Sequence, residues 1–496
     1  MVINLKEYRK NSIQKINLVE EIIYEYFLKC DELSNIKKNN IILLFYHELF
    51  HFYATTITRN EILKYRKKKN NITKYKLLEF MDNYIRFGWR DEKNLFDNIR
   101  NKRKISYKRR LISFIFSISF FRFKGKHLYI GDLSLNNYNI ISKAFLKGYC
   151  IKYIIHEKVF LDKAKEQVNL LFELIAKIDE KVKINYDKNK LNEDVNYSVE
   201  SIITEDIKEI TKYKKNDVLI IGTPAKFYNR IASINSYCLG ANVIGVLHGE
   251  ESGSVSAPAW RFDDRSCSHS LIGYGSGGSY QKNQDINFLS LDNIHQDYIE
   301  SDCESLKYHY INKSIETLNT STPKKGLYIS WRLNNTSVIN PYDIMDIQDY
   351  IEWQNFLLDK YPEVSIKVHP KQKNIINYKN NKVFGNLIDQ IKSYDFFIFD
   401  YVSSTAFAQI AATNKPIIYY NLGLSKFTND GISHLKERVI WCDVNICNNN
   451  DGFELFSENK EKKINMFTKF FSLSNSKKSR IDALFDTIKA SQKIVK

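Results

Sequence analysis

The stretch DFFIFDYVSSTAFAQIAATNKPIIYY, residues 395–420, decides the fold. It opens with an apolar run typical of a buried β-strand, passes through a turn of hydroxyl residues, and continues with helix-forming residues. A second apolar run follows Lys415 and Pro416. A strand, a helix and a strand in this order predict a βαβ unit, and such units build parallel sheets. The segment therefore predicts an α/β fold.

The same alternation of strands and helices extends to both sides of this segment. An earlier series includes DVLIIGTPAKF (217–227), and a later one begins at GLYISWRLNN (326–335). Two such series predict two Rossmann-like domains that face each other across a cleft, with ligands beyond the carboxyl ends of the strands. We expect a helical basic region at 1–125, the first domain at 126–315, the second at 316–450, and C-terminal helices at 451–496.

The amino-terminal region is helical and strongly basic. KINLVEEIIYEYFLKC (15–30) repeats apolar residues at three- and four-residue spacings, which predicts a helix. Residues 1–126 hold 28 Lys and Arg against 13 Asp and Glu, a net +15 of the +17 carried by the whole chain. RNKRKISYKRRLISFIFSISFFRFKGK (100–126) fits either a segment at an anionic membrane surface or a core helix with solvated ends. No nucleic-acid motif accompanies the charge, so we expect no nucleic-acid partner.

The cysteines and the amino-terminal sequence indicate the cellular compartment. The seven cysteines are scattered and never form a CxxC pair, which argues against a disulfide framework and a thiolate zinc site. MVINLKEYRKNSIQ has no apolar core typical of a secretory signal. LISFIFSISFF (111–121) is too short to span a bilayer. We expect a cytoplasmic protein whose basic region can contact the inner membrane peripherally.

Three consecutive hydroxyl residues, Ser403, Ser404 and Thr405, stand between a predicted strand and a predicted helix. Hydroxyl groups and free backbone N–H groups at a helix N-terminus bind anions, so a phosphate is the expected ligand. The alternative is that one of the three only caps the helix.

Two further strands of the second series end in candidate ligands. SIKVHPKQ places His369 at the end of a strand, where an imidazole can hydrogen-bond a phosphate, and Pro370 stiffens the turn. GLYISWR places Arg332 after another strand, as a fixed cation suited to a diphosphate. A surface salt bridge is the alternative for Arg332.

The first series carries candidates for a general base. GVLHGEESGS ends a strand with His248, Glu250 and Glu251 around a glycine turn. A histidine or carboxylate at a strand end, across the cleft from the donor, could remove a proton from an acceptor hydroxyl. The alternative is a turn with solvated glutamates.

Together, GLYISWR, VHP, DYVSSTAF, KPIIYY and the HG turn resemble the bacterial CDP-glycerol glycerophosphotransferase group. They are also similar to the capsule-type and sialyltransferase-like glycosyltransferases of the GT-B fold. The resemblance covers roughly residues 217–425 and is most specific in VHP and DYVSSTAF. Leu247 stands where the glycerophosphotransferases usually have an aromatic residue, and Ala408 where they often have an acidic one. These departures favour a nucleotide-sugar donor, with CMP-linked sugars among the candidates.

The resemblance implies roles for the candidate residues. His369, Ser403, Ser404 and Thr405 would bind the nucleotide and phosphate of the donor, with Arg332 assisting. His248 would occupy the position of the base, while Glu250 and Glu251 are similar to the acidic motif whose carboxylate is the base in bacterial sialyltransferases. The expected reaction is inverting transfer of a sugar to a surface glycan or lipid-linked acceptor, without metal or cofactor. A CDP-glycerol-type transferase and a nonenzymatic glycan scaffold remain alternatives.

HELFH, residues 47–51, points to a different chemistry. His47 and His51 lie one helical turn apart with Glu48 between them, the pattern of a zinc metalloprotease. Such a site needs a third ligand, for which Glu61 is the nearby acidic candidate, and TTIT (55–58) does not favour a continuing helix. The apolar neighbours favour a packed core helix, so the metalloprotease is kept as an alternative.

Overall fold

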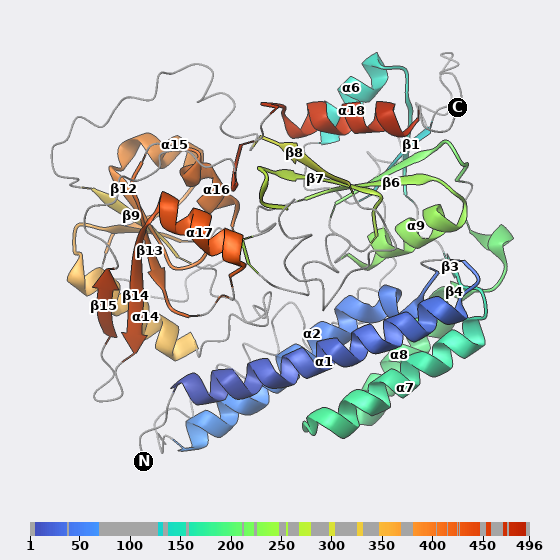
Figure 1. Ribbon diagram of the computed structural model, residues 1–496, viewed down its shortest axis with the longest axis horizontal. Coiled ribbons are helices and arrows are strands. Elements are labelled where there is room, and N and C mark those ends of the chain that lie inside the picture. The colour runs from blue at the N-terminus through green and yellow to red at the C-terminus, as the bar shows by residue number, and fades with distance from the viewer. Residues whose placement is uncertain are drawn as a thin grey trace.

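The computed structural model has a mixed α/β architecture with two large sheets and a layer of long helices (Figure 1). It describes residues 5–36, 39–68, 127–131, 137–154, 158–210, 213–222, 226–247, 254–255, 267–278, 297–302, 325–330, 347–368, 380–402, 404–413, 415–423, 425, 427–446, 453–457, 470–473 and 476–492. The two sheets lie side by side in Figure 1, and the long helices run beneath them.

The first sheet is parallel throughout, with the strand order β2-β1-β5-β6-β7-β8. Its strands are β1 (His127–Ile130), β2 (Cys150–Tyr153), β5 (Val218–Ile221), β6 (Asn242–Val246), β7 (Ser270–Tyr274) and β8 (Asp297–Ser301). β5 (VLII) and β7 (SLIGY) are buried along their whole length, as expected of parallel strands covered on both faces. Helices from distant parts of the chain supply this cover: α6 (Asn137–Leu146), α9 (Phe227–Cys238) and α18 (Arg480–Ser491).

The second sheet has the order β11-β10-β9-β12-β13-β14-β15, in which only β15 runs antiparallel to its neighbour. Its strands are β9 (Gly326–Ile329), β10 (Ser365–Lys367), β11 (Lys382–Val383), β12 (Phe396–Phe399), β13 (Ile417–Asn421), β14 (Ile440–Ile446) and β15 (Phe453–Ser457). Its helices are α14 (Ile347–Lys360), α15 (Leu387–Gln390), α16 (Thr405–Ala411) and α17 (Asn429–Arg438). The βαβ unit predicted at residues 395–420 is confirmed as β12, α16 and β13.

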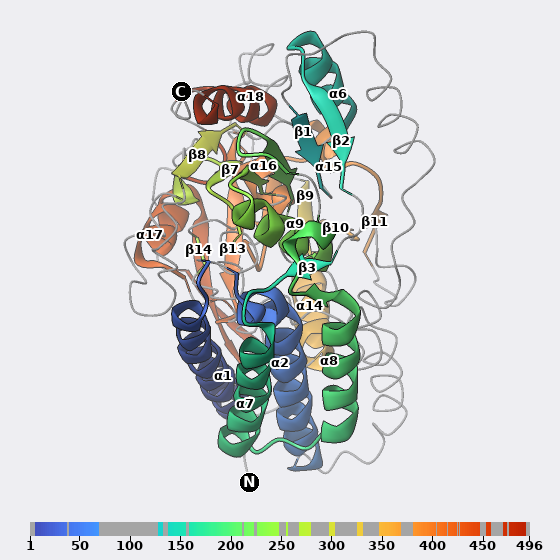
Figure 2. The same cartoon turned by 90° about the vertical axis from the view of Figure 1, so that its right-hand side faces the viewer.

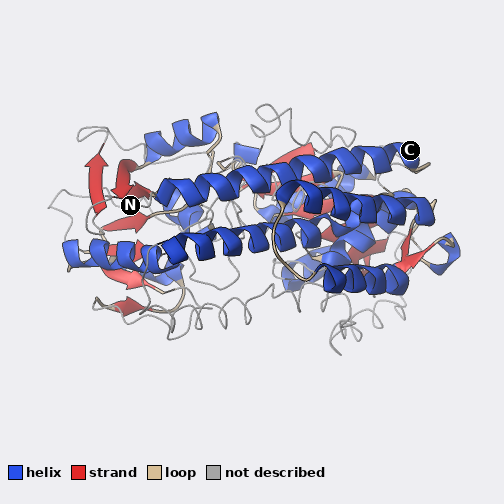
Figure 3. Cartoon of the chain, turned by 90° about the horizontal axis from the view of Figure 1, so that it is seen from below, coloured by secondary structure: helices blue, strands red, loops and turns tan. Residues whose placement is uncertain are grey.

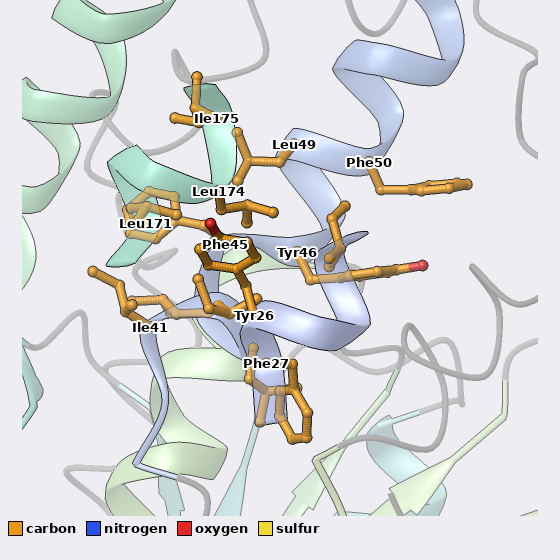
Figure 4. Packing of buried hydrophobic residues seen from close by; sticks show 14 of the residues in the cluster. Tyr26, Phe27, Ile41, Phe45, Tyr46, Leu49, Phe50, Leu171, Leu174 and Ile175 are labelled. Carbon is orange, nitrogen blue, oxygen red and sulfur yellow. The ribbon is translucent and has the colours of Figure 1, made fainter. Parts of the chain in front are cut away.

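The helical layer contains α1 (Leu5–Leu33), α2 (Ile41–Lys68), α7 (Ala164–Val182) and α8 (Lys188–Ile202). Figures 2 and 3 show these long helices running alongside one another. In Figure 4, Phe45 and Leu49 of α2 lie near Leu174 and Ile175 of α7, in a shared apolar core. A short parallel pair, β3 (Val159–Phe160) and β4 (Ile203–Thr204), flanks α7 and α8.

The expectation that a helix would not continue through TTIT is wrong, because α2 runs to Lys68. Thr56 and Thr58 donate their hydroxyl hydrogens to the carbonyl oxygens of Phe52 and Ala54, each at 2.8 Å, so both side chains are satisfied within the helix. The residues around them are buried, and this packing overrides a weak local preference. The predicted amino-terminal helix at 15–30 is confirmed within α1.

Among the described residues, no helix is both long enough and apolar enough to cross a bilayer. The basic segment 100–126 lies outside the described residues. Residues 451–496, expected to form C-terminal helices, contribute β15 to the second sheet as well as α18. α18 packs on β6, β7 and β8, on the face of the first sheet away from the long helices (Figure 1).

Loops that follow the carboxyl ends of strands connect the two sheets. Ser254 and Val255 come after β6 of the first sheet, and Phe427 and Thr428 come after β13 of the second. Val255 forms an antiparallel bridge with Phe427, and the Thr428 N–H donates to the carbonyl oxygen of Ser254 at 3.2 Å. A Cβ on Gly431 would lie 2.4 Å from the same oxygen, so a larger residue there would push the loops apart. A loop that follows a strand of the first sheet therefore contacts a loop that follows a strand of the second.

Candidate functional site

The strand order makes neighbours of the three strands that precede the predicted donor-binding segments. β10, β9 and β12 are neighbours: Ile329 pairs with Lys367, and Tyr328 pairs with Ile398. Arg332, His369 and Ser404 follow the carboxyl ends of these three strands. Seven predicted site residues lie outside the described residues: His248, Glu250, Glu251, Arg332, His369, Pro370 and Ser403.

Ser404 is the N-cap of α16. Its backbone is extended, and its hydroxyl oxygen accepts a hydrogen bond from the Phe407 N–H at 3.0 Å. The hydroxyl keeps its own hydrogen for donation, so capping and ligand binding are compatible. Thr405 begins the helix, and both side chains are half-buried. Phe407 packs against Phe399, which fixes the start of the helix on the end of β12.

Asp400, the residue directly after β12, lies in a buried cage of neutral donors. Its Oδ2 accepts hydrogen bonds from the Tyr328 hydroxyl at 2.5 Å, the Tyr350 hydroxyl at 2.9 Å and the Trp353 indole N–H at 3.1 Å. Oδ1 is buried and has no hydrogen-bond partner among the described residues. Burial raises the pKa of Asp400 to about 6, although the three hydrogen bonds act in the opposite direction. Tyr328 comes from β9, and Tyr350 and Trp353 from α14.

Arg438 holds the other end of α16. This fully buried side chain donates from Nε to the carbonyl oxygen of Ala411 at 3.0 Å, and from Nη2 to those of Ile410, Thr413 and Lys415 at 2.9 to 3.2 Å. A cation at a helix C-terminus complements the helix dipole. Burial lowers the pKa of Arg438 to about 10, so the side chain stays charged at neutral pH.

The carboxyl edge of the first sheet is anchored on both sides of the predicted base residues. Leu247, just before His248, donates its N–H to the carbonyl oxygen of Ile272 at 2.9 Å. Arg480, at the start of α18, donates from Nη1 to the carbonyl oxygen of Leu247 at 2.7 Å. Ser254, just after Glu251, is hydrogen-bonded to Thr428 of the second sheet's loop. The segment that carries His248, Glu250 and Glu251 thus begins on one sheet and ends against the other.

The HELFH residues are buried inside the helical layer. Glu48 forms an ion pair with Arg230 of α9, and the Arg230 Nε donates to the carbonyl oxygen of Leu44 at 2.8 Å. The rings of His47 and His51 lie with their centroids 4.3 Å apart and their planes tilted by 59°.

Glu61, the third-ligand candidate, makes ion pairs with Lys15 at 2.8 Å and Lys64 at 2.9 Å. Burial acts to raise the pKa of Glu61, but the two lysine hydrogen bonds outweigh it and the pKa is lowered. Within the described ranges, no group of three or more His, Cys, Asp and Glu is placed to hold a metal ion. Glu48 and Glu61 thus have cationic partners that account for their burial.

A cavity of about 860 Å³ opens at the opposite, amino-terminal edge of the first sheet. The first residues of β5, β6 and β7 line it together with one face of α18. It contains none of the predicted site residues, and ligands of parallel α/β sheets bind at the carboxyl edge. We therefore place the candidate site at the carboxyl edges and not in this cavity.

Asp400 and Arg480 were not among the predicted site residues. A carboxylate directly after a buried strand was a visible signal for Asp400, which stands in the quoted motif. The partners of Asp400 in α14 and the contact between Arg480 and Leu247 join residues far apart in the chain, and no local pattern indicates them. The chain matches no protein-family model, and no curated protein sequence matches it.

Proposed function

We propose that the chain is an inverting, metal-independent glycosyltransferase of the GT-B type. It would move a sugar from a nucleotide-sugar donor, with CMP-linked sugars among the candidates, to a surface glycan or lipid-linked acceptor. The donor would bind the second sheet, and the first sheet would carry the base. The single observation that supports this most is the strand order of the second sheet.

Numbered along the chain, the strands of the second sheet from β11 to β14 have the order 3-2-1-4-5-6. This is the order of Rossmann-like nucleotide-binding sheets, which bind their ligands where the order reverses. Here the reversal lies between β9 and β12. Arg332 follows β9, and Ser403, Ser404 and Thr405 follow β12. His369 and Pro370 follow β10, the next strand.

The strand order of the first sheet supports a Rossmann-like domain in this part of the chain as well. Its strands β2, β1, β5, β6 and β7 have the order 2-1-3-4-5, the other common arrangement of doubly wound sheets. The contact of Ser254 and Val255 with Phe427 and Thr428 joins a loop after β6 to a loop after β13, which supports carboxyl edges that face each other. A base at His248, Glu250 or Glu251 would then face the donor across this junction.

The proposed sugar transfer needs a general base and groups that stabilise the leaving phosphate. The base would take the proton of the acceptor hydroxyl while that oxygen attacks the anomeric carbon, and the nucleotide would leave on the opposite face, with inversion. The Ser404 hydroxyl and the cations near the strand ends would stabilise the charge that develops on the leaving phosphate. Because fixed donors supply this stabilisation, the proposal needs no metal.

The first experiment is binding of CMP, CDP, UDP and GDP by thermal shift and titration calorimetry, with EDTA present throughout. Ser404→Ala is compared with Ser479→Ala, because Ser479 is the N-cap of α18 and accepts from the Asp482 N–H at 3.2 Å. Both variants should lose about 1 kcal/mol of folding stability. Only Ser404→Ala should weaken nucleotide binding, by about tenfold, the loss of one hydrogen bond to a charged group.

Binding of none of the four nucleotides would refute the proposal and favour a nonenzymatic role. Equal loss of binding in both serine variants would move the donor site away from α16. Tight binding of CDP, followed by transfer from CDP-glycerol, would instead establish the polyol-phosphate alternative.

A further inference from the structure

Asp400 carries a charge that packing alone does not require. The side chain is 2% exposed, and the residues that hydrogen-bond it, Tyr328, Tyr350 and Trp353, contribute neutral groups. A carboxylate buried without a cation is costly even when hydrogen-bonded, and apolar residues could fill the same volume. Strongly perturbed groups of this kind cluster at functional sites.

The position of Asp400 points to the function it serves. Asp400 is the first residue after β12 and comes four residues before the N-cap Ser404. Its hydrogen bonds reach back to β9 and α14, on the other side of the line where the strand order reverses. The two residues after Asp400, Tyr401 and Val402, are also buried. The side chain therefore fixes the start of the loop that leads to Ser404.

We propose that Asp400 is a positioning residue of the donor site, which as a carboxylate gathers three hydrogen bonds and so places the Ser404 hydroxyl against the donor phosphate. The proposal rests on the function proposed above. Asp400 does not touch the substrate, since both of its oxygens are buried; it acts through the loop.

The protonation state of Asp400 decides how many hydrogen bonds it can accept. An ionised carboxylate only accepts hydrogen bonds, with about four lone-pair sites on its two oxygens, whereas a carboxylic acid carries an O–H donor and has less capacity to accept. Among the described residues, the side chains that hydrogen-bond Asp400 are Tyr328 from β9 and Tyr350 and Trp353 from α14, and Gln354 of α14 interacts with Tyr328. Burial raises the pKa of both tyrosines well above the ordinary value, so these groups stay neutral while Asp400 titrates.

Donor affinity should therefore fall as the pH falls through about 6, where Asp400 takes up its proton. If only the ionised form binds, the apparent dissociation constant should rise about tenfold between pH 7 and pH 5. Phosphate groups and histidine side chains ordinarily titrate in the same range. The informative quantity is accordingly the difference between variants at each pH.

The test is calorimetric titration with CMP, CDP, UDP and GDP between pH 5 and pH 8 for the wild type, Asp400→Asn and Tyr350→Phe. Asp400→Asn should weaken binding about tenfold at pH 7.5 and lose the part of the pH dependence that is due to Asp400. Tyr350→Phe removes one of the donors that lower the pKa of Asp400. In this variant the fall in affinity on acidification should begin at a higher pH. If Asp400 is purely structural, both substitutions should change the melting temperature but not the pH at which nucleotide affinity falls. That result would overturn the proposal.

A second measurement needs no nucleotide. The pH dependence of unfolding, compared between the wild type and Asp400→Asn, shows whether Asp400 titrates with a raised pKa. If Asp400 titrates with a raised pKa but no nucleotide binds, the proposed function is refuted whatever the role of Asp400. If a nucleotide binds and Asp400→Asn matches the wild type in affinity at every pH, the function stands and the positioning role is refuted.

Discussion

Buried charges are satisfied differently in the helical layer and in the second sheet. On α2, the carboxylate of Glu48 meets the guanidinium of Arg230, so charge meets charge. Around α16, the described hydrogen-bond partners of Asp400 at one end and Arg438 at the other are neutral hydroxyl, indole and carbonyl groups. An ion pair depends on a single partner, whereas a charge held by dipoles depends on the placement of several. Glu48 therefore serves packing, while Asp400 and Arg438 hold α16 and its loop in position.

The largest loss of stability is expected when the ion pair between Glu48 and Arg230 is broken. Glu48→Leu leaves the buried guanidinium of Arg230 without its counter-charge and should lower the free energy of unfolding by about 3–5 kcal/mol. Glu48→Leu with Arg230→Leu should recover most of this loss, because apolar residues can replace a buried pair. Urea unfolding of the single and double variants measures the coupling. A Glu48→Leu variant that keeps wild-type stability but loses a zinc-dependent protease activity would revive the metalloprotease hypothesis.

The next largest effect is the cost in folding stability of ionising Asp400. Its pKa is higher in the folded protein, about 6, than the ordinary 3.8. Its contribution to stability is therefore complete below pH 3.8 and is lost as the pH rises through about 6. The total is on the order of 3 kcal/mol. Urea unfolding at several pH values should show this loss in the wild type and not in Asp400→Asn, and equal profiles would contradict it.

A smaller loss is expected for Arg438→Met, which keeps an apolar stem and removes the hydrogen bonds to four carbonyl groups at the end of α16. Leaving buried acceptors unsatisfied should lower the free energy of unfolding by about 2–3 kcal/mol. Arg438→Lys is the control, because it keeps the charge but loses the planar set of donors, and its loss should be smaller. Equal losses in urea unfolding would show that geometry matters more than charge at this site.

The smallest effect is expected where an ion pair is exposed. Lys158 and Glu209 lie 2.8 Å apart with about half of each side chain exposed, 49% and 46%. Solvent screens such a pair, so Lys158→Ala should leave the free energy of unfolding unchanged within error. A loss as large as that of Glu48→Leu would mean that burial does not separate the two kinds of pair.

The sequence predicts local elements well where burial shapes composition. FFIF, GLYI and VLII are recognisable as strands because parallel strands are apolar on both faces. Strand order is not local: β9 and β12 are neighbours in the sheet, although α14, β10, β11 and α15 lie between them in the chain. The continuation of α2 through TTIT likewise depended on the core around it.

The candidate site shows the same division. Ser404 was predictable because a cap residue stands beside the helix that it caps. Asp400 was visible as a residue, but its three donors come from β9 and α14 and could not be read from the motif. HELFH has the spacing of a metal site, yet its glutamate is paired with Arg230, a residue far away in the chain. Spacing indicates which side chains share a helix face, and only the tertiary partners decide what that face does.

The position of α18 has a consequence for biosynthesis. Leu484, Phe485 and Ile488 share a core with Ile130, Ile220 and Ile244 of the first sheet. A ribosome releases every strand of that sheet, and then the whole second sheet, before these three residues emerge. The nascent first sheet therefore has an apolar face exposed during most of translation, a surface that chaperones recognise. Although the first sheet is synthesised first, it is completed last, so the two parts of the molecule must mature together.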